Sequence, residues 1–293
     1  MYNEIAQETR KIILPTNDVA FKKTFASPQS TLISMGFLKD LANHDPLRVL
    51  NIKSLTIETP YNYRDVNQLE AEYDKGTLYT EVDFACMDES GVRFVLEMQM
   101  QEEVYLEERI EYNTGEKYGQ LYAKDKTSDS KYSELKPVIS IVILGKNYFE
   151  DDVPIRYLRP HDVRHDLYKK NLNLGLEIYI ELKKDPSYLP RNLQLWFEFF
   201  RTGSVSKGAP SYLKEAAKMI EKTGFTKEER AVASRIERAR MKRWSEDAFQ
   251  IKKGEKQKAI EIARSLLVSG MPIDEVAQHS GLDASAIENL ITE

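Results

Sequence analysis

The chain has 293 residues, of which 41% are hydrophobic and 30% charged, and its formal net charge is −5. This composition supplies enough apolar side chains for a core and excludes a chain that is disordered throughout. Its one cysteine, Cys86, excludes an intramolecular disulfide and is typical of a reduced, cytoplasmic protein. The longest apolar run, residues 138–144, is too short to cross a bilayer, and the N-terminus lacks an apolar secretory signal. We therefore expect no membrane partner.

Charge is spread unevenly along the chain. Residues 1–200 carry 25 basic and 33 acidic side chains, residues 201–258 carry 16 and 8, and residues 259–293 carry one and six. The basic middle block is the natural place for a polyanion to bind. The length fits one sizeable α/β domain with appendages, which we place at residues 1–200, followed by a helical region over residues 201–293.

The first third of the chain predicts two helices and a strand. Thr16 or Asn17 can cap the first helix, and Phe21 and Phe25 share one face of it because they are four residues apart. The expected elements are a helix over residues 18–25, a helix over about 30–43 and a strand over 50–59.

The next stretch predicts a β-hairpin. Residues 81–87 and 93–100 alternate between apolar and polar side chains and are rich in strand formers. A three-residue loop, Glu89-Ser90-Gly91, fits between them, with Gly91 in the left-handed conformation that such loops need. In that register the numbers of paired residues sum to 180, so Asp83 lies directly across from Glu97.

One face of this hairpin is apolar, and the other carries Glu81, Asp83, Glu97 and Gln99. Like charges directly opposite each other destabilise a sheet. A divalent cation between Asp83 and Glu97 would convert this repulsion into coordination. The alternative is an ordinary solvated strand face, which is common in antiparallel sheets.

The rest of the chain predicts a helix, two strands and a run of helices. In the helix over residues 102–126, side chains at steps of three and four form one stripe: Arg109, Tyr112, Glu116 and Gln120. The continuous apolar run within residues 136–145 is typical of a buried strand, and residues 174–182 predict another. The aromatic residues 193–200 indicate a core helix, and the pattern is helical from residue 211 onward.

This order of elements and acidic residues resembles the PD-(D/E)XK nuclease superfamily, and more closely its recombination-promoting nuclease or transposase branch. The resemblance covers about residues 10–200. The stretches that carry it are Asn17-Asp18-Val19-Ala20-Phe21-Lys22-Lys23-Thr24-Phe25, Glu81-Val82-Asp83, Glu97-Met98-Gln99, and residues 109–120, 132–141 and 177–183.

The resemblance implies a restriction-endonuclease-like core in the order α-β-β-β-α-β, an α/β fold with a mixed central sheet flanked by helices. It also implies hydrolysis of DNA phosphodiesters with Mg²⁺, for which Mn²⁺ can substitute. On that model Asp83, Glu97 and the Met98 carbonyl bind the metal, and Asp18 is either a further acidic ligand or a first-turn residue stabilised by the helix dipole. The superfamily usually has Lys where this chain has Gln99, which can orient water or phosphate but cannot act as a base.

The resemblance gives Arg109 and Gln120 a role in supporting the site or in contacting DNA. The alternative is an ordinary polar stripe.

In the C-terminal region Arg235 and Arg238 lie in a basic helical segment. This segment is suited to contact DNA phosphates, or alternatively to form ion pairs along a solvated helix. Residues 272–287 resemble a helix-turn-helix with Ala277, Gly281 and Ile287 at its packing points. Because residues 271–293 have no Lys or Arg, we expect packing or homodimerisation there rather than DNA binding.

Three functions are open from the sequence. The favoured one is a DNA endonuclease that acts in recombination, mobile-element or defence contexts. The alternatives are a transposase that transfers DNA strands and an inactive nuclease fold that serves as a DNA-binding or interaction module.

His161 and His165 are four residues apart and would form a metal pair on a helix, although their charged, Pro-flanked surroundings favour surface residues.

Overall fold

A computed structural model describes residues 11–45, 52–58, 84–101, 105–122, 136–162, 164, 167–168 and 174–292. The chain divides into two compact units, residues 1–237 and residues 238–293. None of the helices in the described ranges is both long and apolar enough to cross a membrane.

The first unit is built on a mixed six-stranded sheet in the order β1-β2-β3-β4-β8-β5. The parallel strands β3, β4 and β8 form its centre, and the other three strands pair antiparallel to their neighbours. The strands are β1 (Leu55–Ile57), β2 (Phe84–Asp88), β3 (Arg93–Gln99), β4 (Val138–Leu144), β5 (Ile155–Leu158) and β8 (Leu174–Glu181). This mixed sheet, with helices on both faces and a long helical C-terminal region, confirms the predicted α/β fold class.

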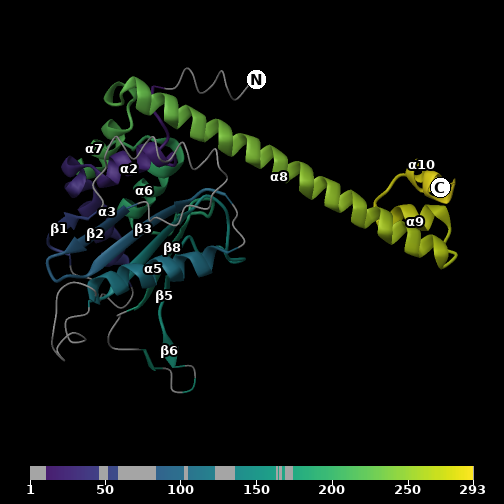
Figure 1. The fold of residues 1–293 in the computed structure, drawn as a ribbon, viewed down its shortest axis with the longest axis horizontal. Coiled ribbons are helices and arrows are strands. Elements are labelled where there is room, and N and C mark those ends of the chain that lie inside the picture. Colours follow the sequence, from purple (N-terminus) through teal and green to yellow (C-terminus); the bar gives the residue numbers. More distant parts are fainter. Residues whose placement is uncertain are drawn as a thin grey trace. The chain divides into compact units, whose positions relative to one another are not determined.

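Helices cover both faces of the sheet (Figure 1). On one face, the apolar side chains of α2, α3, α6 and α7 join those of the strands in a single large core. On the other face lies α5 (Leu106–Tyr122), which contacts β4 and β8. The helices of the first face are α2 (Asp18–Ala26), α3 (Thr31–His44), α6 (Arg191–Thr202) and α7 (Ser211–Met219).

The hairpin of β2 and β3 has the predicted register. Its partners Phe84 and Leu96, Ala85 and Val95, and Cys86 and Phe94 all have numbers that sum to 180. Gly91 has a φ of 85°, in the left-handed region where the three-residue loop requires glycine. The loop length and the alternation of the two arms were therefore sufficient to determine the pairing.

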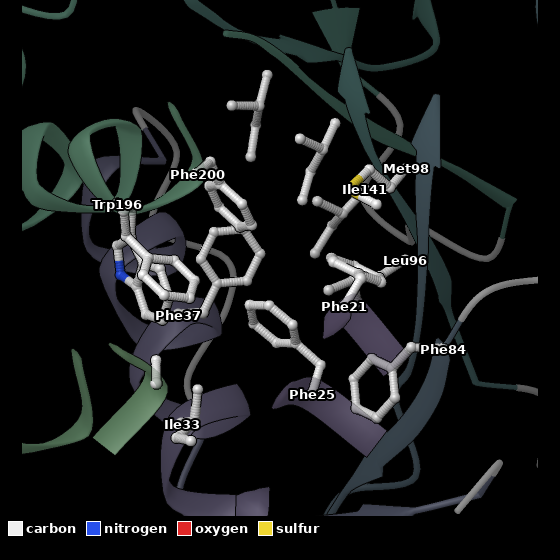
Figure 2. Close-up of a cluster of buried hydrophobic side chains, with 14 of the residues drawn as sticks. Phe21, Phe25, Ile33, Phe37, Phe84, Leu96, Met98, Ile141, Trp196 and Phe200 are labelled. Carbon is white, nitrogen blue, oxygen red and sulfur yellow. The ribbon is translucent and has the colours of Figure 1, made fainter. Parts of the chain in front are cut away.

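Aromatic rings fill the centre of the large core (Figure 2). The Phe25 ring lies 5.5 Å from that of Phe37, 5.9 Å from that of Trp196 and 6.0 Å from that of Phe200, measured between centroids. These contacts connect α2, α3 and α6, and the Phe84 ring of β2 lies 6.5 Å from Phe25. The aromatic helix is thus part of the core, as its sequence predicted, and it holds α2 against the sheet.

The N-terminal helix begins where the capping residues predicted. Asn17 is the N-cap of α2, and its Oδ1 accepts a hydrogen bond from the backbone N–H of Val19. Its Nδ2 donates to the carbonyl of Ala233 at 3.0 Å, in the first part of α8 (Lys227–Val268). Lys23 donates to the Glu229 carboxylate at 2.9 Å. The start of α8 is therefore attached to α2 by two side chains.

Two short strand pairings were not predicted. Strand β5 pairs antiparallel with β8, and residues 161–162 form the two-residue strand β6, which pairs with β7 (Leu167–Tyr168). The helical placement of His161 and His165 was therefore wrong: His161 is exposed in β6, and His165 lies outside the described residues. These segments are only two to four residues long, so their pairing depends on backbone hydrogen bonds to neighbours rather than on a periodic side-chain pattern.

The second unit consists of the end of α8 with α9 (Ile273–Ser280) and α10 (Ala284–Thr292). Its small core is formed by Ala263, Val276 and Ile287, one residue from each helix. Gly281 ends α9 with a φ of 72°, in the left-handed conformation that favours glycine at a helix C-terminus. The predicted packing of Ile287 and Ala277 is confirmed. The prediction was wrong for Gly281, which is exposed and serves as the end of the helix.

The thiol of Cys86 lies in the apolar face of β2 and is fully buried. Burial, followed by the nearby carboxylates of Glu58 and Asp88, strongly raises its pKa, so the reactive thiolate is suppressed in the folded state. We expect a disulfide reagent such as DTNB to react with the native protein only at the rate of unfolding. Stopped-flow measurement in increasing urea checks this, and fast modification of the protein in buffer would contradict it.

Candidate active site

Glu97 lies on β3 with its side chain on the face of the sheet that α5 covers. The neighbouring residues Leu96 and Met98 point into the large core on the opposite face, as strand alternation requires. The Glu97 residue is only 7% exposed. The alternative interpretation, a solvated strand face, is therefore wrong for Glu97, because the α5 helix excludes most of the solvent.

Two apolar residues of α5 determine which of its sides meets the sheet. Leu106 and Ile110 pack with Val142 of β4 and Tyr179 of β8 in a small buried cluster. Residues three and four positions further along a helix share the same face, so this packing turns the next polar side chains of α5 toward the strands. The apolar contacts thus bring polar groups of α5 to Glu97.

Asn113 and Arg109 of α5 contact the end of β3. The Asn113 Nδ2 donates to Glu97 Oε1 at 2.5 Å. A guanidinium nitrogen of Arg109 lies 3.5 Å from Glu97 Oε2 and 3.4 Å from Gln99 Oε1. One amide and one positive charge therefore face the buried carboxylate, and both favour its ionised form.

The sequence analysis did not identify Asn113. Its predicted stripe followed Tyr112 and Glu116, but Tyr112 is 61% exposed and Glu116 is exposed as well, whereas Asn113 is 2% exposed. The signal was present, because Asn113 is four residues after Arg109 and three after the apolar Ile110. Only the packing of α5 shows which of two adjacent stripes faces the sheet.

A second polar contact between α5 and the sheet lies one residue further along the helix. The hydroxyl of Thr114 hydrogen-bonds with the Ser140 hydroxyl of β4, and the Thr114 hydroxyl also donates to the carbonyl of Ile110 at 2.6 Å. These buried hydroxyls have the partners that buried polar groups ordinarily require. They therefore anchor α5 beside Glu97 and leave no polar group of this pair unpartnered.

The other predicted site residues lie elsewhere in the fold or outside the described ranges. Asp83 lies outside the described residues, and the side chain of Gln120 in α5 is likewise outside them. Asp18 is buried in the first turn of α2, which packs on the sheet face opposite Glu97. Arg235 and Arg238 are exposed on α8. The roles assigned to all five stay predictions.

The groups around Glu97 fit a divalent metal site in chemical type. Within the described ranges no set of three His, Cys, Asp or Glu side chains is close enough to hold a metal ion. Glu97 nevertheless supplies a buried carboxylate. Gln99 carries an amide oxygen that accepts from Arg109, and Asn113, whose Nδ2 donates to Glu97, carries a second amide oxygen. Hard cations such as Mg²⁺ and Mn²⁺ prefer carboxylate and carbonyl oxygens, so these donors fit one part of such a site.

Comparison with known proteins identifies the chain by family. Searches of the curated proteins and of the solved structures gave no match. The model of the PD-(D/E)XK nuclease family transposases matches residues 15–254, a span that runs from α2 into α8 and includes Glu97 and its contacts from α5. The chain is therefore a member of the PD-(D/E)XK nuclease family transposases.

Proposed function

We propose that this protein is a Mg²⁺-dependent DNA endonuclease that hydrolyses phosphodiester bonds in recombination, mobile-element or defence contexts. The observation that carries the proposal is the buried Glu97 carboxylate, which accepts a hydrogen bond from Asn113 and lies beside the guanidinium of Arg109. Burying a carboxylate costs desolvation free energy even beside a guanidinium, and cation binding is a function that justifies this cost. Family membership supports nuclease chemistry with DNA as the substrate.

In this proposal Glu97, Asp83 and the Met98 carbonyl hold the cation. Asp18, whose helix packs on the other face of the sheet, takes the alternative role of a first-turn residue stabilised by the dipole of α2. The observed hairpin register, in which partner numbers sum to 180, is the one on which the pairing of Asp83 with Glu97 rests. When bound, such a cation activates water and stabilises the charge that develops on the phosphate. Gln99 cannot take a proton from water, so its role is to orient water or a phosphate oxygen by hydrogen bonds.

Arg109 is the positive group nearest to this carboxylate in the described residues, and we assign it to the phosphate of the DNA. Its guanidinium lies at the ends of both Glu97 and Gln99. Gln120 on the same helix and the exposed Arg235 and Arg238 of α8 are proposed to contact the DNA backbone. Such contacts make binding weaken steeply as the salt concentration rises.

A plasmid-nicking assay tests the proposal directly. We expect the purified full chain to convert supercoiled DNA to nicked or linear DNA in Mg²⁺ or Mn²⁺. Joined products from DNA with 3′-hydroxyl ends would instead identify strand transfer. If no DNA is cut and calorimetry detects no binding of Mn²⁺, the nuclease proposal is refuted and the inactive DNA-binding fold is favoured.

Arg109→Gln should change cation affinity and cleavage in opposite directions. Because a positive charge about 4 Å from a divalent cation repels it by about 2 kcal/mol even in water, its removal should tighten Mn²⁺ binding by about 30-fold. Loss of the phosphate contact should lower kcat by about 100-fold. Calorimetry with Mn²⁺ and the initial nicking rate check the two effects.

The matched control is Arg191→Gln, which makes the same change at an exposed arginine at the start of α6. It should leave both quantities unchanged. Weaker Mn²⁺ binding in Arg109→Gln would show that Arg109 mainly positions Glu97 and would contradict the phosphate assignment.

A further inference from the structure

The amide of Asn113 uses only one of its two ends. Its Nδ2 donates to Glu97, whereas its Oδ1 is buried and has no hydrogen-bond partner among the described residues. The residue is 2% exposed, so bulk water does not supply the missing donor. An unpartnered buried acceptor costs about 1–3 kcal/mol, and such a group in a native protein calls for an explanation such as an ion or an ordered water.

We propose that Asn113 is an oxygen donor of the cation site and that its amide turns over when the cation binds. Without the cation, its N–H group satisfies Glu97; with the cation, its Oδ1 faces the metal next to the Glu97 carboxylate. This inference rests on the proposed function, because it assigns a further residue to the same cation site.

Turning the amide over is inexpensive because only one hydrogen bond holds it. Rotation by half a turn exchanges the positions of Nδ2 and Oδ1, so that Oδ1 comes to lie beside Glu97 Oε1. Among the described residues, the one bond given up is that between Nδ2 and Glu97, since Oδ1 has no partner there. An amide held at both ends would lose two bonds instead.

The resulting arrangement suits a cation that the two oxygens share. Two oxygens that face each other repel when no positive charge lies between them. Neighbouring oxygens in an octahedral Mg²⁺ site lie about 3 Å apart, because each is about 2.1 Å from the metal. The present 2.5 Å contact between Asn113 Nδ2 and Glu97 Oε1 shows that the two side chains already approach closely enough for this.

The neighbouring Thr114 is an example of a polar residue with a purely structural role. Thr114 also points from α5 to the sheet, and its hydroxyl is fully engaged with Ile110 and Ser140. A structural role for Asn113 would account for the hydrogen bond of its N–H group but not for the buried Oδ1, which has no hydrogen-bond partner among the described residues. A cation ligand accounts for the oxygen end of the amide.

Calorimetric titration of the DNA-free full chain with Mn²⁺ tests the inference. The variants are Asn113→Leu, which removes both ends of the amide at similar size, and Asn113→Asp, which keeps an oxygen and removes the N–H donor. We expect Asn113→Leu to bind Mn²⁺ about 10- to 100-fold more weakly, and Asn113→Asp to bind it at least as tightly as the unmodified protein. Thr114→Val is the matched control and should bind Mn²⁺ normally.

The outcomes separate the inference from the proposed function. If Asn113→Asp binds as weakly as Asn113→Leu, only the N–H donor matters and the inference is wrong. Unchanged binding in Asn113→Leu, together with loss of binding in Glu97→Ala, also overturns it while leaving the cation site intact. No binding by the unmodified protein overturns the proposed function itself. Far-UV circular dichroism and thermal unfolding without cation identify a variant that fails to fold, in which case Asn113→Ser is the substitute.

Discussion

Glu97→Ala should lower Mg²⁺-dependent DNA cleavage at least about 1,000-fold, which corresponds to about 4 kcal/mol of transition-state free energy. The reason is that Glu97 is the buried carboxylate to which both Asn113 and Arg109 turn. Without it the site keeps the positive charge of Arg109 and loses its negative partner, so a divalent cation is repelled rather than held. The initial rate of conversion of supercoiled to nicked plasmid measures the effect.

Two controls make this result specific. Glu108→Ala removes an exposed carboxylate from the same α5 helix and should cleave at the normal rate. Asp83→Ala should reproduce the loss seen in Glu97→Ala, because the proposal places both carboxylates on one cation. A Glu97→Ala protein that unfolds normally on heating and still cuts DNA at the original rate would remove Glu97 from the site.

The hairpin shows what local rules determine. Gly91 and the length of the Glu89-Ser90-Gly91 loop leave one register for strands whose alternation is continuous, and the observed pairing of Phe84 with Leu96 agrees with it. Placing Glu97 on the face opposite the core follows from that register and from the alternation of β3. No information from distant segments was needed for either prediction.

The environment of Glu97 depends on contacts that are far apart in the sequence. Whether a strand face is solvated or covered is decided by α5, and the orientation of α5 is decided by Leu106 and Ile110 packing with Tyr179 of β8. Tyr179 follows α5 by more than fifty residues in the chain. Periodicity within α5 allows neighbouring stripes, so the sequence alone offered Tyr112 where the structure places Asn113.

The same end of the sheet contains, on β8, a buried ion pair that the sequence did not indicate. Gln99 of β3, Leu144 of β4 and Glu181 of β8 form one row across the parallel strands. Glu181 is 1% exposed and accepts hydrogen bonds from the backbone N–H groups of Tyr148 at 2.5 Å and Phe149 at 3.1 Å. Its other oxygen accepts from Lys184 Nζ at 2.5 Å. The carboxylate thus fastens the loop after β4 to the end of β8.

Lys184→Met should lower the free energy of unfolding by about 3–5 kcal/mol, because it leaves the Glu181 charge buried without its counterion. Lys184 is 4% exposed, so water cannot replace the ammonium group without opening the structure. Asp151 lies 3.4 Å from Lys184 Nζ and is about half exposed. Loss of its contact with Lys184 should therefore cost little stability. Urea denaturation followed by tryptophan fluorescence measures the change.

The double variant Glu181→Gln with Lys184→Met separates charge burial from lost packing. Glutamine keeps an oxygen to accept from the N–H groups of Tyr148 and Phe149 and carries no charge, so most of the stability should return. If the double variant were as unstable as Lys184→Met alone, the cost would lie in the packing of the lysine stem rather than in an unpaired carboxylate. Recovery would instead show that the unpaired charge of Glu181 causes the instability of Lys184→Met, because removing both charges restores the free energy of unfolding.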